Sequence, residues 1–145
     1  MKVKDTRKYL LYLLLGSLAA LAGLFTYWAY QPSDVFKTSG PLFVVPATNM
    51  AGGLAKITVS YCKSTSVPGI ARTSYVSSSN EVFQPTTIER SPKGCADNVE
   101  IPVVIPKDLV PDTYFIRFKI TYRVNPIKTV VEEVDTEKFN VVASN

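Results

Sequence analysis

Two cysteines, Cys62 and Cys95, are the residues of this chain whose type and spacing suggest chemistry most directly. Such a pair can form a disulfide, work as a redox couple or contribute to a metal site. The pair is not a C-x-x-C motif and no second cluster of ligands accompanies it, so we expect a disulfide in an oxidising compartment. Closing a loop of about 34 residues would stabilise the fold by about 3.8 kcal/mol in the chain-entropy model.

The chain contains no histidine. The usual general base, the commonest metal ligand and every Ser-His or Cys-His nucleophile are therefore missing. Gly52-Gly53 lacks the following Lys-Ser/Thr or helix of a phosphate-binding loop. A catalytic pair of carboxylates is the remaining alternative, and the acidic residues in or near expected loops are Glu89, Asp97, Glu100, Asp108 and Asp112. Because loop carboxylates are usually solvated, we expect no catalytic site, no metal and no cofactor.

Residues 9–30 form an uninterrupted apolar stretch without a charged side chain. At about 1.5 Å per residue, 22 residues reach about 33 Å, which is enough to cross a hydrocarbon core of about 30 Å. Aromatic residues, which prefer the headgroup level, stand at both ends: Tyr9, Tyr12, Tyr27, Trp28 and Tyr30. The stretch predicts a transmembrane helix.

Charge predicts the orientation of this helix. Residues 1–8 carry a basic cluster of Lys2, Lys4, Arg7 and Lys8, and the positive-inside rule keeps such a segment in the cytoplasm. Everything after residue 30 is then exported to the periplasm or the cell exterior. That part holds 12 basic and 11 acidic residues, so the basic excess belongs to the anchor and nucleic acid is not an expected partner.

A cleaved signal peptide is the alternative interpretation of the same stretch, because Ala20-Leu21-Ala22 offers a small-x-small cleavage site. The apolar run is longer than the 7–15 residues typical of a signal peptide. No cysteine stands directly after the run, which excludes a lipoprotein signal. We therefore favour a signal-anchor.

Residues 31–40 are a polar connector that starts with the helix-stopping Pro32. Ten residues extend at most about 33 Å, so the following domain works close to the bilayer. Residues 41–145 are the size of one domain with one hydrophobic core.

The domain is expected to be all-β, because its segments rich in Val, Ile, Thr, Tyr and Phe are separated by turn residues. The expected strands are 41–47, 54–62, 99–105, 113–124 and 127–142, with weaker candidates at 72–76 and 82–90. No apolar pattern of helical period follows the anchor. Five to seven strands over this length predict a two-sheet sandwich.

Strands 113–124 and 127–142 are expected to form a hairpin around Asn125-Pro126. The alternation on the second strand is interrupted by Glu132-Glu133, since a strict period of two would point one of these carboxylates inward. We expect a β-bulge there, which would return Val134, Phe139 and Val141 to the inner face.

The segment 105–114, with Leu109, Pro111 and Tyr114, resembles the approach to the penultimate strand of immunoglobulin-like and fibronectin type III-like sandwiches. The resemblance implies a tyrosine corner in which Tyr114 folds back onto the loop and Leu109 caps the core. It also implies an Ig-like sandwich of about seven strands. It implies no function, because a fold does not specify one.

Two features are candidates for binding. Gly16, Ala19, Ala20 and Gly23 place small residues on one side of the helix, where another transmembrane helix can approach closely, although small residues are common in such helices. Residues 64–80, rich in serine and threonine, have the composition of an adaptable surface loop, or of an ordinary polar connection.

These features together predict a non-enzymatic, membrane-anchored accessory or structural subunit of a cell-envelope complex. It would act by protein-protein contact, with the bilayer, other transmembrane helices and envelope proteins as partners. The alternatives are a phage-encoded lysis or superinfection-exclusion factor, a filament subunit with a helical core, and a small-molecule sensor domain. The residues specify no oligomeric state.

Overall fold

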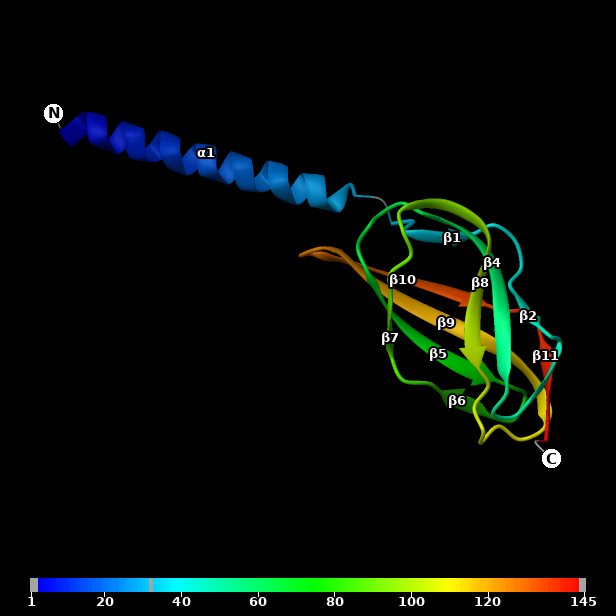
Figure 1. Cartoon of the computed structure of the whole chain (residues 1–145). Coiled ribbons are helices and arrows are strands. Elements are labelled where there is room, and N and C mark those ends of the chain that lie inside the picture. Colours follow the sequence, from blue (N-terminus) through cyan, green and yellow to red (C-terminus); the bar gives the residue numbers. More distant parts are fainter. Residues whose placement is uncertain (1–2, 32, 144–145) are drawn as a thin grey trace. The chain divides into compact units, whose positions relative to one another are not determined.

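The computed structural model describes residues 3–31 and 33–143. Helix α1 spans Val3–Ala29 and includes an apolar segment of 24 residues, Thr6–Ala29. A domain of two β-sheets follows it (Figure 1). Lys2 of the basic cluster, Pro32 of the connector and the last two residues of the expected domain lie outside the described residues.

The smaller sheet has four strands built around β4 (Leu54–Lys63). One edge of β4 pairs with β8 (Gly94–Val104). The opposite edge pairs with two short strands in succession, β1 (Phe36–Thr38) and β2 (Phe43–Val45). All these pairings are antiparallel.

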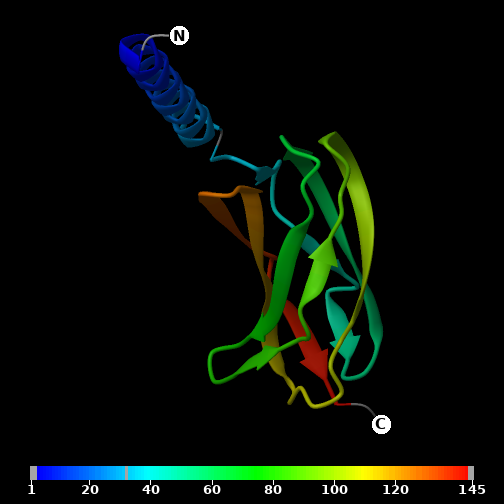
Figure 2. The same cartoon turned by 90° about the vertical axis from the view of Figure 1, so that its left-hand side faces the viewer.

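The larger sheet has seven strands in the order β3-β11-β9-β5-β6, with β10 paired to β9 and β7 paired to β5. The pairing of β3 with β11 is parallel. Figure 2 shows the two sheets as separate layers. The strands of the larger sheet are β3 (Thr48–Met50), β5 (Gly69–Val76), β6 (Glu81–Phe83), β7 (Thr87–Glu89), β9 (Asp112–Asn125), β10 (Lys128–Asp135) and β11 (Phe139–Val142).

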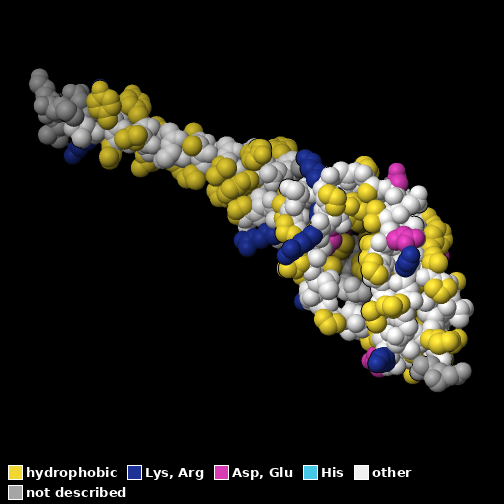
Figure 3. Space-filling view, viewed as in Figure 1, with side chains coloured by type: hydrophobic (Ala, Val, Ile, Leu, Met, Phe, Trp, Pro, Cys, Tyr) yellow, Lys and Arg dark blue, Asp and Glu magenta, His cyan; other side chains and the backbone are white. Residues whose placement is uncertain are grey.

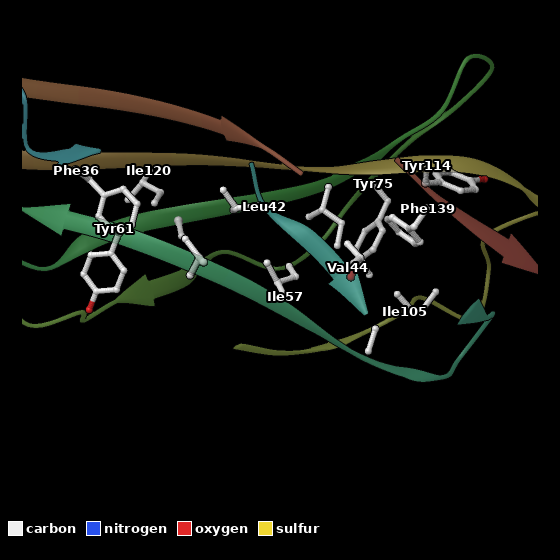
Figure 4. Close-up of a cluster of buried hydrophobic side chains, with 14 of the residues drawn as sticks. Phe36, Leu42, Val44, Ile57, Tyr61, Tyr75, Ile105, Tyr114, Ile120 and Phe139 are labelled. Atoms are coloured by element: carbon white, nitrogen blue, oxygen red, sulfur yellow. The ribbon is translucent and has the colours of Figure 1, made fainter. Parts of the chain in front are cut away.

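The core lies between the two sheets, because their central strands alternate apolar and polar residues and so place one apolar face inward. Ile57 of β4 and Ile116 of β9 are fully buried, and Tyr75 and Phe139 meet edge to face with ring centroids 6.4 Å apart. Figure 4 shows Ile57, Tyr75 and Phe139 between the layers. Burying each large apolar side chain contributes about 1.5–3 kcal/mol relative to exposure.

The predicted β-rich, two-sheet domain after an apolar helix is confirmed. The strands are shorter and more numerous than expected, because three outer rows are each divided into two pieces: β1 and β2, β6 and β7, and β10 and β11. Of the expected strand 41–47, only Phe43–Val45 forms a strand, β2 of the smaller sheet, and β3 of the larger sheet begins after it at Thr48.

One segment expected outside strands contributes to the smaller sheet. β1 lies within the residues assigned to the connector, and Val35 and Phe36 are 1% and 9% exposed there. Two apolar residues among polar ones carry no periodicity, although they are enough to anchor an edge strand. The weaker strand candidate 72–76 is confirmed as part of β5. Because β5 lies within the serine- and threonine-rich segment 64–80, the centre of that segment is a strand and not a surface loop.

The predicted bulge at Glu132-Glu133 is also wrong. β10 keeps a strict alternation, and Glu132 occupies an inward position in which its Oε1 accepts a hydrogen bond from the backbone N–H of Val35 at 3.1 Å. The change of parity occurs later, between β10 and β11, where Thr136 is buried and Phe139 becomes inward-facing. A carboxylate at the rim of the sandwich with a backbone donor removes the need for a bulge.

Candidate functional site

Helix α1 exposes apolar side chains on all sides. No residue of its apolar segment Thr6–Ala29 is buried, and Leu13 is 73% exposed. Its two hydroxyl side chains are satisfied within the helix, since Ser17 Oγ donates to the carbonyl of Leu14 at 2.9 Å and Thr26 Oγ1 to that of Ala22 at 2.7 Å. By length and composition the helix is able to cross a membrane, as a signal anchor or as a signal peptide.

The four small residues singled out from the sequence lie on this helix. Gly16, Ala20 and Gly23 are spaced so that a turn of 3.6 residues brings them to one side, and Ala19 lies beside them. The space around Gly16 and Gly23 is open, with no atom within 4 Å of the position of a Cβ.

Cys62 and Cys95 form the expected disulfide, with an S–S distance of 2.00 Å. They are register partners on the neighbouring strands β4 and β8, and their Cα atoms are 4.0 Å apart. The bridge therefore links two strands of one sheet, on its outer face. It closes the segment that contains β5, β6 and β7.

Immediately after Cys62, the side chain of Lys63 points into the sandwich and is fully buried. Its Nζ lies 2.7 Å from Glu89 Oε2, donates to the carbonyl of Ser91 at 3.0 Å and lies 5.2 Å from the centroid of the Tyr122 ring. The Tyr122 hydroxyl donates to the same Glu89 oxygen at 2.8 Å, and the Ser91 N–H donates to Glu89 Oε1 at 2.5 Å. We call Lys63, Glu89, Ser91 and Tyr122 the polar cluster.

The polar cluster stabilises the ionised carboxylate of Glu89. Burial by itself works to raise the pKa of Glu89, but the hydrogen bonds from Lys63, Ser91 and Tyr122 outweigh it and lower the pKa below its ordinary value. Burial, followed by the adjoining Glu89 carboxylate, raises the pKa of Tyr122. The cluster is thus a closed ion pair at neutral pH, with both Glu89 oxygens already accepting hydrogen bonds.

Sequence reasoning missed the polar cluster. The signal was the alternation of β4, whose inward residues run Ala55, Ile57, Val59 and Tyr61, so the next inward position is Lys63. A buried lysine requires a partner, because an unpaired buried charge is costly. Nothing near Lys63 in the sequence identifies Glu89, 26 residues away, as that partner.

The residues of the expected tyrosine corner lie at the opposite end of the core. Tyr114 is fully buried at the start of β9, and its hydroxyl donates to the carbonyl of Val110 at 3.1 Å. Leu109 is 4% exposed and belongs to the core cluster. Pro111 is exposed and directly precedes β9.

The remaining candidate carboxylates are dispersed over the surface. Glu100 pairs with Lys56 at 2.7 Å on the outer face of the smaller sheet. Asp112 accepts the N–H of Thr113 at 2.7 Å, while Asp97 lies on β8 and Asp108 in the loop before β9. Gly52 adopts a φ of 81° in the turn between β3 and β4, which explains the glycine pair without a bound phosphate.

No protein-family model matches this chain, and no curated protein is similar to it in sequence. The geometry of the helix, the disulfide and the polar cluster is therefore the basis of the functional argument.

Proposed function

We propose that this chain is a non-enzymatic, membrane-anchored accessory or structural subunit of a cell-envelope complex. It acts by protein-protein contact through an exported Ig-like domain and through its transmembrane helix. The observation that carries the proposal is the combination of a fully exposed apolar helix with a disulfide-bridged β-domain on the same chain.

The exposed helix supports a permanent anchor. Leaving its leucines in water would expose far more contiguous apolar surface than a soluble monomer shows. In Figure 3, hydrophobic side chains are distributed along the visible face of the helix. A bilayer, with other transmembrane helices in it, provides the surroundings that these side chains require.

The proposed topology has residues 1–8 in the cytoplasm, residues 9–30 in the membrane and the domain outside. The basic residues before the helix support this orientation through the positive-inside rule. The Cys62–Cys95 bridge supports it independently, since disulfides persist in oxidising compartments and are rare in the cytosol.

The strand order supports an Ig-like sandwich. In immunoglobulin domains, strands A, B, E and D form one sheet and strands C, F and G the other. Here β1 and β2, β4 and β8 match A, B and E, while β5, β9 and the β10–β11 pair match C, F and G. The hydrogen bond from Tyr114 to Val110 matches the tyrosine corner.

Contact is favoured over catalysis because the chain lacks histidine and because its most buried charged groups neutralise each other. Both oxygens of Glu89 accept hydrogen bonds from within the domain. A carboxylate held in this way is a poor base, because the hydrogen bonds that stabilise its ionised form lower its pKa. We expect exchange of Asp97 or Asp108 for asparagine to leave function intact.

Single-cysteine labelling tests the topology. Val110→Cys, at a position 54% exposed, introduces a thiol in the domain, and Thr6→Cys introduces one at the start of the apolar segment. In spheroplasts, a membrane-impermeant maleimide should label the first variant without lysis and the second only after lysis. Labelling in the reverse order, or release of the domain into the medium without its helix, would refute the signal-anchor topology.

Substitutions on one side of the helix test whether the protein acts through helix contacts. Replacing Gly16, Ala20 and Gly23 by leucine should leave insertion intact but block close helix approach, so proteins that co-purify from gently solubilised membranes should be lost. The matched control changes the opposite side of the helix without adding bulk: Leu14→Ile, Leu18→Ile and Phe25→Leu. If the two triple variants recover the same proteins in the same amounts, the helix is only an anchor.

A further inference from the structure

A cavity of about 260 Å³ lies between the two sheets of the β-domain. Its deeper wall is apolar and comes from both sheets, with Ile57 of β4 on one side and Phe118 and Ile120 of β9 on the other. It opens between β7 and β8, where Figure 3 shows the surface hollowed. An apolar cavity of about 150 Å³ in a protein core is large enough to bind benzene.

The opening exists because β8 is an edge strand. Among the described strands β8 pairs only with β4, and no strand lies where an Ig-like domain carries strand D. Ile101 of β8 is the register partner of Ile57 and shares its inner face. Yet Ile57 is 0% exposed and Ile101 is 42% exposed, so the inner face of the sandwich is accessible at this point.

Polar groups in the cavity wall are gathered at one side. Apart from Thr73, the polar lining residues all come from β7 and the two residues after it: Thr87, Glu89, Arg90 and Ser91. Every fully buried side-chain nitrogen and oxygen in the described residues has a hydrogen-bond partner. The apolar interior therefore offers no unsatisfied group to hold water, and it favours an apolar occupant.

The rim of the cavity carries one uncompensated charge. Glu89 is neutralised by Lys63 at 2.7 Å, whereas the exposed Arg90 forms no ion pair with any described residue. An occupant with an apolar tail inside and an anionic group at the rim would complement both features. A neutral or cationic head group would leave the guanidinium without a partner.

We propose that this cavity binds a single-chain anionic amphiphile, with its acyl tail between the sheets and its carboxylate or phosphate at Arg90. Each methylene transferred from water to the apolar wall contributes about 0.8 kcal/mol, so the tail supplies most of the affinity. Arg90 supplies the preference for an anionic head.

An extended strand of a partner protein fits this opening less well. The register of β8 against β4 shifts between Ala96 and Val99, and Asn98 has a φ of 53°, which interrupts the free edge. Pro102 provides no N–H to a neighbouring strand. Bulges and prolines on an edge strand are devices that prevent strand addition.

Photolabelling of the full chain tests the proposal. The protein is placed in phosphatidylcholine nanodiscs, exposed to decanoate with a terminal diazirine, irradiated and mapped by tandem mass spectrometry. We expect label on the residues that line the cavity, such as Val134 and Ile120. Unlabelled decanoate should compete about two to five times better than decanol, as expected for one exposed charge pair. Label confined to α1, or equal competition by the two molecules, would overturn the proposal.

Two variants separate the roles of tail and head. Ile101→Trp, at a half-exposed position, fills the opening and should reduce labelling inside the cavity severalfold; unchanged labelling would overturn the proposal. Arg90→Gln should abolish the preference for decanoate over decanol while label still reaches Val134. Lys93→Gln, which removes an exposed cation of the same segment outside the cavity wall, should retain the preference. Loss of the preference in both variants would refute the role of Arg90.

A second arm identifies the source of the amphiphile. Nanodiscs that contain lysophosphatidylglycerol with a diazirine at the end of its single acyl chain present the same chemistry from the membrane. Label in the cavity from this lipid assigns the tail to the bilayer. Label from decanoate alone assigns it to a free fatty acid.

Discussion

The helix exposes its large apolar side chains, whereas the β-domain buries them. In α1, Leu13 and Leu21 are 73% and 52% exposed, whereas Ile57 and Ile116 of the β-domain are both 0% exposed. The β-domain provides its own apolar surroundings by packing one sheet on another. The apolar segment of the helix has no buried residue, so its side chains require apolar surroundings such as a bilayer.

Polar side chains show the same contrast. The hydroxyls of Ser17 and Thr26 bond to carbonyls three and four residues earlier, so the helix satisfies them without any other element. Lys63 instead depends on Glu89 and Ser91, which follow it by 26 and 28 residues. A membrane helix must satisfy its polar groups locally, while a sandwich can satisfy them between strands distant in the sequence.

The largest expected effect comes from placing charged side chains in the apolar segment of the helix. Leu14→Arg with Leu18→Arg, near the middle of α1, should cost about 6 kcal/mol of insertion free energy and prevent membrane integration. The matched control is Leu54→Arg with Val110→Arg on the β-domain, where these residues are 76% and 54% exposed to water. Carbonate extraction of membranes distinguishes the two double variants: the helix variant should be extracted and the β-domain variant should stay in the membrane. A helix variant that still resists extraction would break the comparison.

Removing one member of the buried ion pair should destabilise the β-domain alone. Lys63→Met leaves Glu89 unpaired and should lower the free energy of unfolding by about 3–5 kcal/mol. The control is Lys56→Met on the same strand, whose pair with Glu100 has the same 2.7 Å distance but side chains 60% and 59% exposed; it should cost at most about 1 kcal/mol. Urea unfolding in nanodiscs, followed by near-ultraviolet circular dichroism, measures both. Equal losses would contradict the assigned burial.

Loss of the disulfide should have an effect of similar size. Cys62→Ser with Cys95→Ser releases the loop that contains β5 to β7 and should lower the free energy of unfolding by about 3.8 kcal/mol in the chain-entropy model. Membrane integration should be unchanged, because the bridge lies wholly within the β-domain. Two free thiols in protein taken from its native membrane would show that the bridge is not part of the native state.

The smallest expected effect concerns the end of the core near Tyr114. Tyr114→Phe removes the hydrogen bond to the Val110 carbonyl and should cost about 1 kcal/mol. Tyr61→Phe is the control, since the hydroxyl of Tyr61 forms no hydrogen bond among the described residues while its ring stacks on Phe36 at 5.1 Å. The same urea titration compares the two. An equal loss of unfolding free energy in the two variants would show that the Tyr114 hydrogen bond does not stabilise the domain.

The elements predicted best are those with a pattern that repeats over many residues. The helix follows from an apolar run, and β4 and β9, strands of ten and 14 residues, are rich in apolar residues, which alternate with polar ones over 114–124 of β9. β1 was missed because a strand of three residues shows no period. The expected bulge in β10 was wrong because Glu132 accepts a hydrogen bond from the backbone N–H of Val35. The disulfide was predictable because the chain has only two cysteines. The cavity at Arg90 was not predictable, because residues from both sheets line it.

The sequence by itself determined the properties that depend on neighbours along the chain: the apolar length of α1, the inward faces of β4 and β9, and the single pair of cysteines. Only the tertiary structure decided which strands lie side by side, that β8 has a free edge, and that Lys63 is paired with Glu89. The physical reason is that backbone geometry sets the direction of a side chain within a strand or helix, so the local period is visible in the sequence. Contacts between strands depend on how loops close, and the cost of closure grows only slowly with loop length, so sequence distance does little to indicate which distant residue becomes the partner.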